Sequence, residues 1–236
     1  MSISRKYGRT FHFPFSPGTT SDDRTNFDWW EDFKRLVEVV ITEKLDGENS
    51  CINSIGVFSR SHAAPNMNPW STHLKEKRAL ILKDIEEGEL EIFGENLYAI
   101  HSIEYKDIDE HFYVFGIRVG DEWLSWEETE EICYLLDLKT VPVIGVYKTS
   151  DFDSPEDFVN LVMSIVGEES TFGSKDSATD EDCTMEGVVV RTSDSYKATV
   201  GGQIDSQNVF KYVRENHVKT DEHWVKNWKV AKLNHW

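Results

Sequence analysis

The sequence has only three cysteines, Cys51, Cys133 and Cys183, which stand far apart and form no Cys-x-x-Cys pair. This spacing excludes a disulfide framework and a cysteine-type zinc site, and it suits a reducing compartment such as the cytoplasm. No run approaches the roughly 18 apolar residues of a membrane-spanning helix. The first residues also lack the apolar stretch of a secretory signal, so we expect a cytoplasmic protein with no membrane partner.

Basic residues are also scarce: 25 Lys and Arg stand against 43 Asp and Glu, which gives a formal net charge of −18 at pH 7. Taken alone, this balance argues against a polyanionic partner such as a nucleic acid. The acidic excess is concentrated in two blocks, −14 over residues 86–137 and −10 over residues 151–186, and the rest of the chain sums to +6. We therefore predict an acidic face opposite a neutral or basic one.

The chain has 236 residues, of which 39% are hydrophobic and 12% aromatic. This length and composition suit a folded protein with a full hydrophobic core. Alternating and β-branched runs predict strands at 39–45, 50–58, 89–94, 111–119, 186–192 and 208–214. Helices and strands are mixed without βαβ regularity, so the expected fold class is α+β with mainly antiparallel sheets.

Helices are predicted from their start signals and from the spacing of apolar residues. The first is expected to begin at Asp28, with Glu31 completing a capping box. Its inward face would hold Phe33, Leu36, Val37 and Val40. Further helices are expected over residues 71–85, from Ser125, from Ser154, and from about Asp221 to the end. Residues 167–184 are expected to form a loop, because Gly, Ser, Thr and Asp dominate there.

The most informative stretch is Glu43-Lys44-Leu45-Asp46-Gly47-Glu48-Asn49, in which a lysine ends a predicted strand and a tight turn follows. A lysine at such a place is held rigidly and is partly desolvated, as a nucleophile requires. The plain alternative is a β-hairpin whose Asp-Gly turn follows a lysine by coincidence. Since Lys-x-Asp-Gly arises by chance in about one chain of this length in twenty, the motif alone does not separate the two interpretations.

Four further stretches combine a strand with polar or aromatic residues. They are EIFGEN at 91–96, FYVFGIR at 112–118, EGVVVR at 186–191 and VFKYVR at 209–214. Taken singly, the aromatic strand fits a protein core and the acidic residues fit solvated strand ends. Their order and spacing therefore carry more information than any one of them.

In that order, the five stretches resemble the covalent nucleotidyltransferase superfamily, which comprises ATP-dependent DNA and RNA ligases and mRNA-capping enzymes. The resemblance covers roughly residues 40–215 and looks most like the small RNA ligases. It implies a nucleotidyltransferase (adenylation) domain over residues 1–214, with mainly antiparallel sheets flanked by helices and ATP in the cleft between the sheets. The tail, residues 215–236, is expected to be helical, and it is too short for an appended OB barrel.

The resemblance also implies roles for individual residues. Lys44 would attack the α-phosphate of ATP, expel pyrophosphate and carry AMP as a phosphoramidate, and we expect burial and nearby cations to lower the pKa of Lys44 from about 10.4. Phe115 would stack on adenine. The residues implied in ATP binding are Glu43, Asp46, Asn49, Arg60, Glu95, Phe115, Glu186 and Lys211. Glu186 and Glu95 would hold Mg²⁺ (or Mn²⁺), directly or through water.

Two features of the sequence stand apart from these motifs. A segment shared with small RNA ligases occurs here as YGRT at 7–10 and SPGTTSDDR at 16–24, and nothing in the sequence explains it. In the last motif, many relatives carry a second lysine two positions after the first, whereas this chain has Val213. Arg214 is adjacent, but it should point to the opposite face of the strand.

The resemblance implies RNA ends as substrate, joined from a 3′-OH and a 5′-phosphate, with an end-healing kinase or phosphatase as a possible partner of a monomeric enzyme. A minimal DNA ligase, a capping enzyme and a non-catalytic nucleotide- or RNA-binding module are the alternatives. The intact Lys44, Glu95, Glu186 and Lys211 speak against the non-catalytic module. On the tail helix, Trp224, Trp228 and Ala231 would form a packing stripe.

Overall fold

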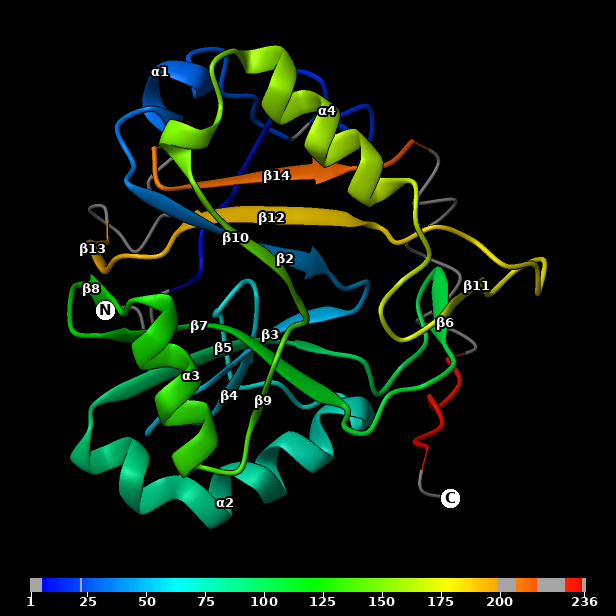
Figure 1. Cartoon of the computed structure of the whole chain (residues 1–236). Helices are drawn as coiled ribbons and strands as arrows, with labels where there is room; N and C mark the ends of the chain where they lie inside the picture. The colour runs from blue at the N-terminus through cyan, green and yellow to red at the C-terminus, as the bar shows by residue number, and fades with distance from the viewer. Residues whose placement is uncertain (1–5, 22, 199–206, 216–227, 235–236) are drawn as a thin grey trace.

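The computed structural model describes residues 6–21, 23–198, 207–215 and 228–234. Two sheets face each other, and helices cover the outer face of each, so that the layers run helix, sheet, sheet, helix (Figure 1). A third, two-stranded sheet lies at one end of this arrangement. Among the described residues, no helix combines the length and the apolar character needed to cross a membrane.

The first sheet has five strands in the order β1 (Phe11–His12), β14 (Val209–Val213), β12 (Gly187–Thr192), β2 (Glu38–Lys44) and β10 (Val143–Lys148). All neighbours are antiparallel except β1 and β14. Strands β2 and β12 are central because their β-branched runs bury side chains on both faces. Glycine is required at Gly187, since a Cβ there would overlap the Tyr212 carbonyl of β14.

The second sheet contains β13 (Tyr196–Lys197), β8 (Glu122–Trp123), β7 (Phe112–Val119), β5 (Leu90–Asn96), β3 (Glu48–Ile52) and β4 (Val57–Ser59), in that order. A short strand, β9 (Lys139–Thr140), runs parallel to β7, and the other pairs are antiparallel. The small sheet pairs β6 (Ile103–Tyr105) with β11 (Ser174–Asp176).

Within the described ranges, α-helices cover the outer faces of the two main sheets (Figure 1). The first sheet is covered by α1 (Trp29–Phe33) and α4 (Pro155–Val166), and the second by α2 (Thr72–Glu87) and α3 (Trp126–Leu135). Short 3-10 turns, η1 (Pro69–Ser71) and η2 (Thr149–Asp151), precede α2 and α4. A separate apolar cluster contains residues of both sheets, such as Val40 and Phe93, and therefore lies between them. The α+β class with mainly antiparallel sheets is confirmed.

The capping boxes predicted for two helices are present. Ser125 and Glu128 cap α3, and Ser154 and Asp157 cap α4, each with reciprocal side-chain bonds to backbone N–H groups. The prediction for the first helix is wrong in its cap and its length. Asp28 makes no side-chain cap bond and α1 ends at Phe33. Of the residues expected on its inward face, Val37 is 72% exposed and Val40 belongs to β2.

Three other expectations need correction. The single strand expected at 50–58 is two strands, because the Asn53 side chain accepts the N–H groups of Ile55 and Gly56 and turns the chain. Strand β11 lies inside the segment expected to be a loop, and β10 is not among the expected strands. The described part of the expected tail helix, residues 228–234, is not helical, and Val230 forms an isolated bridge with Ala99. Residues 221–227 lie outside the described residues.

The hairpin interpretation of the lysine motif is also wrong. Strand β2 pairs with β10 and β12, whereas β3 pairs with β4 and β5. The chain therefore crosses from one sheet to the other between Lys44 and Glu48. This crossing puts the motif at the place where the two sheets diverge.

Candidate active site

A cleft of about 480 Å³ opens between the two sheets, within the size range of small-molecule binding sites. Every residue that the sequence analysis selects lines it. These are Glu43, Lys44, Asp46, Asn49, Arg60, Glu95, Phe115, Glu186 and Lys211. Six separate stretches of the chain thus converge on one cavity.

Strand periodicity explains which side chains reach the cleft from the first sheet. On β2, Val40 lies in the cluster between the sheets, and Thr42 and Lys44 follow it at two-residue intervals into the cleft. On β14, Val209 and Lys211 share the same face. The alternate residues pack under α1 and α4 instead.

The turn after Lys44 is fixed by contacts with β6. The Asp46 N–H donates to the Tyr105 hydroxyl at 2.7 Å, and the Asp46 carboxylate accepts the Ile103 N–H at 2.8 Å. Gly47 allows a close approach to β5, since a Cβ there would lie 2.6 Å from the Asn96 carbonyl oxygen. Asp46 therefore acts on the backbone of the turn and holds Lys44 in place.

Lys44 forms an ion pair with Glu186, the residue directly before β12. Burial alone would lower the pKa of Lys44, but the charges of Glu186 and Glu95 outweigh it and raise that pKa above its usual value. This differs from the expected lowering by burial and cations. In this state the Lys44 amine carries a proton.

Glu95 occupies the opposite wall, on β5, and accepts the Gly47 N–H at 3.1 Å. Burial, opposed by Lys44 and reinforced by the charge of Glu186, raises the pKa of Glu95 to about 8. Two acidic side chains thus flank one ammonium group. A divalent cation bound between them would stabilise the ionised form of Glu95 and lower its pKa.

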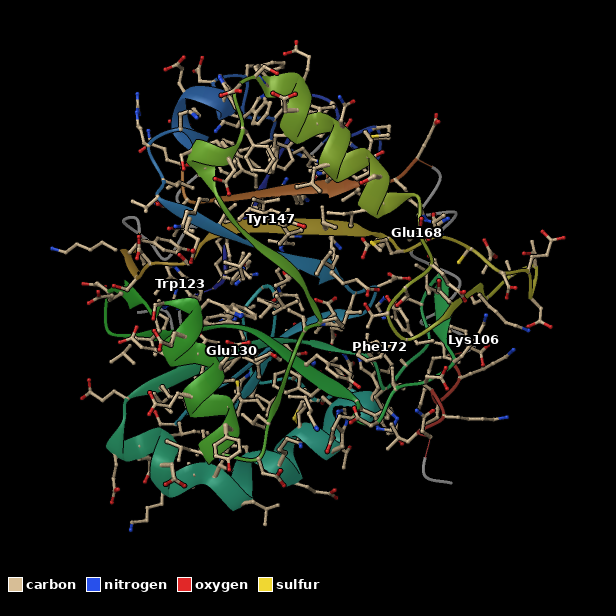
Figure 2. All side chains as sticks on the ribbon, viewed as in Figure 1. Lys106, Trp123, Glu130, Tyr147, Glu168 and Phe172 are labelled. Atoms are coloured by element: carbon tan, nitrogen blue, oxygen red, sulfur yellow. The ribbon has the colours of Figure 1, made fainter. Side chains whose placement is uncertain are left out.

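Glu43 and Asn49 lie on either side of the crossing between the sheets. The Glu43 carboxylate accepts the Thr171 N–H at 2.9 Å, so the segment between α4 and β11 holds it. That segment is anchored by Phe172, which packs against Tyr113 at 4.9 Å between ring centroids and lies beside the β6–β11 sheet in Figure 2. Asn49 stands opposite Glu95 in the β3–β5 register.

Phe115 presents a largely buried ring to the cleft from β7. Tyr7 packs against it edge-on at 4.9 Å between centroids, and the Arg191 guanidinium donates to its backbone carbonyl. Arg191 is in turn stacked on Trp126 at 5.2 Å. Phe115 is therefore fixed on two sides, as a ring that stacks on a ligand needs to be.

Lys211 and Arg60 supply positive charge from opposite sheets. Burial and the charge of Lys44 lower the pKa of Lys211, while Asp23 opposes this. Neither Val213 nor Arg214 is among the residues that line the cleft, so Arg214 does not replace the missing second lysine there. The Arg214 N–H instead donates to the Glu186 carbonyl at 2.9 Å.

The charge of the cleft is nearly balanced. Its lining includes the carboxylates of Glu43, Asp46, Glu48, Glu95 and Glu186 and the basic groups of Lys44, Arg60, Arg191 and Lys211. Glu130 of α3, which lies in the first acidic block, is exposed and is not among the residues that line this cavity. The cleft is thus neutral rather than acidic on every side.

Several lining residues escaped the sequence analysis. They are Tyr7, Gly8, Thr10, Thr42, His101, Val141, Val189 and Arg191, with several neighbours in the lysine motif. Tyr7, Gly8 and Thr10 belong to the N-terminal segment, which the sequence alone does not explain, and they lie in the wall of the cleft. Thr42, Val189 and Arg191 could have been found by two-residue steps along β2 and β12 from Lys44 and Gly187.

No group of three or more His, Cys, Asp or Glu side chains in the described ranges is arranged to hold a metal ion. Glu95 and Glu186 offer hard oxygen donors, which Mg²⁺ and Mn²⁺ prefer. The donor set therefore fits a divalent cation that takes its remaining ligands from water and from a phosphate.

Two facing sheets with a reactive-lysine motif between them define a nucleotidyltransferase fold of the ligase type. An ATP and manganese complex of a variant RNA ligase from Naegleria gruberi has a TM-score of 0.52 at 17% identity, over 89% of this chain and 60% of that chain. The same enzyme with pyrophosphate has a TM-score of 0.51 at 16% identity, over 90% and 60%. An archaeal ATP-dependent RNA ligase has a TM-score of 0.49 at 15% identity, over 86% and 48%.

The family model described as RNA ligase matches residues 37–213, about three quarters of the sequence. The chain belongs to the RNA ligase family. It spans about half to three fifths of the length of the solved structures it resembles. No curated protein sequence matches it.

Proposed function

We propose that this protein is an ATP-dependent RNA ligase that joins a 3′-OH end to a 5′-phosphate end through a lysyl-AMP intermediate. The observation that carries the proposal is the placement of Lys44 beside two acidic side chains, Glu95 and Glu186, inside a cleft that also holds a fixed aromatic ring and the cationic side chains of Lys211 and Arg60. The family membership of residues 37–213 supports the same reaction.

In the first step, the Lys44 Nζ attacks the α-phosphorus of ATP and the bond from that phosphorus to the bridging oxygen breaks. Pyrophosphate leaves, Nζ loses a proton, and AMP stays on Lys44 as a phosphoramidate. Lys211 and Arg60 stabilise the negative charge that develops on the phosphate oxygens. Phe115 fixes the adenine ring, so that the α-phosphate stays near Nζ.

Glu95 and Glu186 would hold a divalent cation, which supplies positive charge at the phosphates and competes with Lys44 for the Glu186 carboxylate. Relief of the Glu186 ion pair lowers the pKa of Lys44, because that carboxylate is the largest source of its upward shift. A cation-bound Glu186 would no longer favour the ammonium form of Lys44, so more of the amine would be neutral, as the attack requires.

In the next two steps, AMP passes from Lys44 to the RNA and is released. An oxygen of the RNA 5′-phosphate attacks the phosphorus of lysyl-AMP, the P–N bond breaks, and Lys44 recovers its proton. The RNA 3′-OH then attacks the 5′-phosphorus of the RNA-adenylate, AMP leaves, and a phosphodiester bond forms.

The test is ligation of a substrate panel by the purified chain with ATP and Mg²⁺. The panel contains nicked, bridged and single-stranded RNA, each with 3′-OH and 5′-phosphate ends, and a nick whose 3′ end is deoxyribose. We expect sealing of at least one RNA substrate, preference for 3′-ribose, and loss of sealing in Lys44→Ala but not in Lys106→Ala. Lys106 is a matched control because it is also ion-paired with carboxylates, on the surface beside β6 (Figure 2).

Two results would contradict the proposal. Sealing only of the 3′-deoxyribose nick would identify a minimal DNA ligase instead. Binding of ATP or RNA without any covalent product would identify a non-catalytic binding module.

A further inference from the structure

The N-terminal segment is built into the active site by strand pairing. β1 adds to the edge of β14 in parallel, with Phe11 opposite Phe210 and His12 opposite Lys211. Beyond β1, the Gly18 N–H donates to the Val213 carbonyl at 2.9 Å, and a Cβ at Gly18 would overlap the Arg214 carbonyl. Upstream, Tyr7, Gly8 and Thr10 line the cleft. The segment shared with small RNA ligases thus runs along the strand that carries Lys211.

Within this segment, one carboxylate faces Lys211. The Asp23 Oδ1 lies 3.2 Å from the Lys211 Nζ and 3.3 Å from the His12 Nε2. The other oxygen, Oδ2, accepts the Thr20 N–H at 3.0 Å and the Thr20 hydroxyl at 2.9 Å. Both oxygens of the Asp23 carboxylate are therefore held in fixed directions.

The histidine beside this carboxylate is uncharged at neutral pH, because burial and the charge of Lys211 lower the pKa of His12 to about 4. Ser16 Oγ accepts the Val213 N–H at 2.9 Å, donates to the Val213 carbonyl at 3.3 Å and lies 2.8 Å from the His12 Nδ1, so the imidazole is fixed in place beside Asp23. The negative charge of Asp23 is therefore directed at Lys211 rather than shared with a second cation.

Lys211 needs such a partner because its surroundings oppose its charge. It is largely buried, and both Lys44 and Arg60 repel its ammonium group. Burial alone would raise the pKa of Asp23, but the charge of Lys211 and the bonds from Thr20 lower it, so Asp23 is ionised. Among the largest influences on the pKa of Lys211, the charge of Asp23 and its hydrogen bond are the ones that raise it.

We propose that Asp23 is a positioning residue of the active site, which holds the Lys211 ammonium charged and directed at the α-phosphate position. The inference rests on the proposed function, in which Lys211 contacts that phosphate. It gives the N-terminal segment a role: the segment supplies the counter-ion of a transition-state cation. Asp23 itself is not among the residues that line the cleft.

The test measures adenylylation of Lys44 at varied ATP in wild type, Asp23→Asn, Lys211→Met and the double variant. We expect Asp23→Asn to lower kcat by about 10- to 100-fold, the range for loss of a hydrogen bond between charged groups. KM for ATP should change by less than about threefold, because the contact matters most in the transition state. Added to Lys211→Met, the Asp23→Asn change should cost less than about threefold, because Asp23 acts through Lys211.

Two further variants separate positioning from folding. Thr20→Val keeps the carboxylate but removes one of its bonds, and it should lower kcat by less than Asp23→Asn with KM unchanged. Asp182→Asn is the matched control, because Asp182 pairs with the exposed Lys106 at 2.8 Å, and it should leave both constants unchanged.

The outcomes are distinguishable. The role of Asp23 is overturned if Asp23→Asn has a kcat within threefold of wild type. It is also overturned if Asp23→Asn lowers kcat by the same factor in the Lys211→Met background as in wild type. Neither result affects the proposed function. A raised KM with an unaltered kcat also overturns the role of Asp23. Absence of adenylylation in the wild-type protein refutes the proposed function and this inference with it.

Discussion

Substitution of Glu186 by glutamine should change the reactivity of Lys44 in opposite directions in two assays. The charge of Glu186 raises the pKa of Lys44 more than any other charge does, and the Glu186 side chain is only 5% exposed. Glutamine keeps the shape but removes the charge, so the pKa of Lys44 falls and more of the amine is neutral. Adenylylation should nevertheless decrease, because the variant has lost a carboxylate that holds the divalent cation.

The size of the effect follows from the contact. A hydrogen bond between two charged groups contributes about 1.5–3 kcal/mol. Glu95 and Asp46 remain near Lys44 and retain part of the upward shift, so we take the lower end of this range. Acylation of Lys44 in the absence of ATP and metal should then become at least about tenfold faster at pH 8.

The assay is competitive acylation with a small anhydride, read peptide by peptide in the mass spectrometer. Asp182→Asn is the control, because the Lys106 pair that it breaks is exposed and should change Lys106 labelling by less than about threefold. Unchanged or slower labelling of Lys44 in Glu186→Gln would refute the assignment of its pKa to Glu186.

Three predictions concern stability, each measured by urea unfolding. Gly187→Ala should cost about 2–3 kcal/mol, because its Cβ would overlap the Tyr212 carbonyl, and a neutral effect would contradict this packing. Arg118→Met should cost about 1.5–3 kcal/mol, since it removes a fully buried guanidinium and its 2.8 Å ion pair with the partly exposed Glu91, and a loss below about 1 kcal/mol would contradict this. Burial lowers the pKa of His62 from 6.5 to about 4. The contribution of neutral His62 to the free energy of unfolding is therefore complete above pH 6.5 and is lost as the pH falls toward 4. Wild type should therefore lose about 2–3 kcal/mol more than His62→Asn over this window, and equal losses would refute the shift.

Much of the fold could be predicted from the sequence because its signals are local. The β-branched runs that become β2 and β12 and the Ser-x-x-Glu and Ser-x-x-Asp caps of α3 and α4 need no knowledge of distant residues. The failures occur where distant contacts decide. α1 ends after five residues, and the apolar residues that follow it do not extend its buried face: Val37 is exposed and Val40 lies in β2.

In the candidate site, too, local motifs could be predicted from the sequence and contacts between distant residues could not. The order of the motifs selected residues that all line one cleft, but the sequence could not show that β2 and β3 belong to different sheets. It also gave the wrong direction for the pKa of Lys44, because the contact with Glu186 joins residues 142 positions apart. The place of Asp23 beside Lys211 depends on a parallel pairing between the two ends of the chain, which no local pattern predicts.

The central claim is that Lys44 becomes covalently linked to AMP. The most direct measurement is incubation with ATP and Mg²⁺, denaturation, and peptide mapping of the adduct. The account predicts one AMP per chain, on the peptide that contains Lys44, released by acid and absent from Lys44→Ala. An unmodified protein, or an equal amount of adduct in Lys44→Ala, would contradict it.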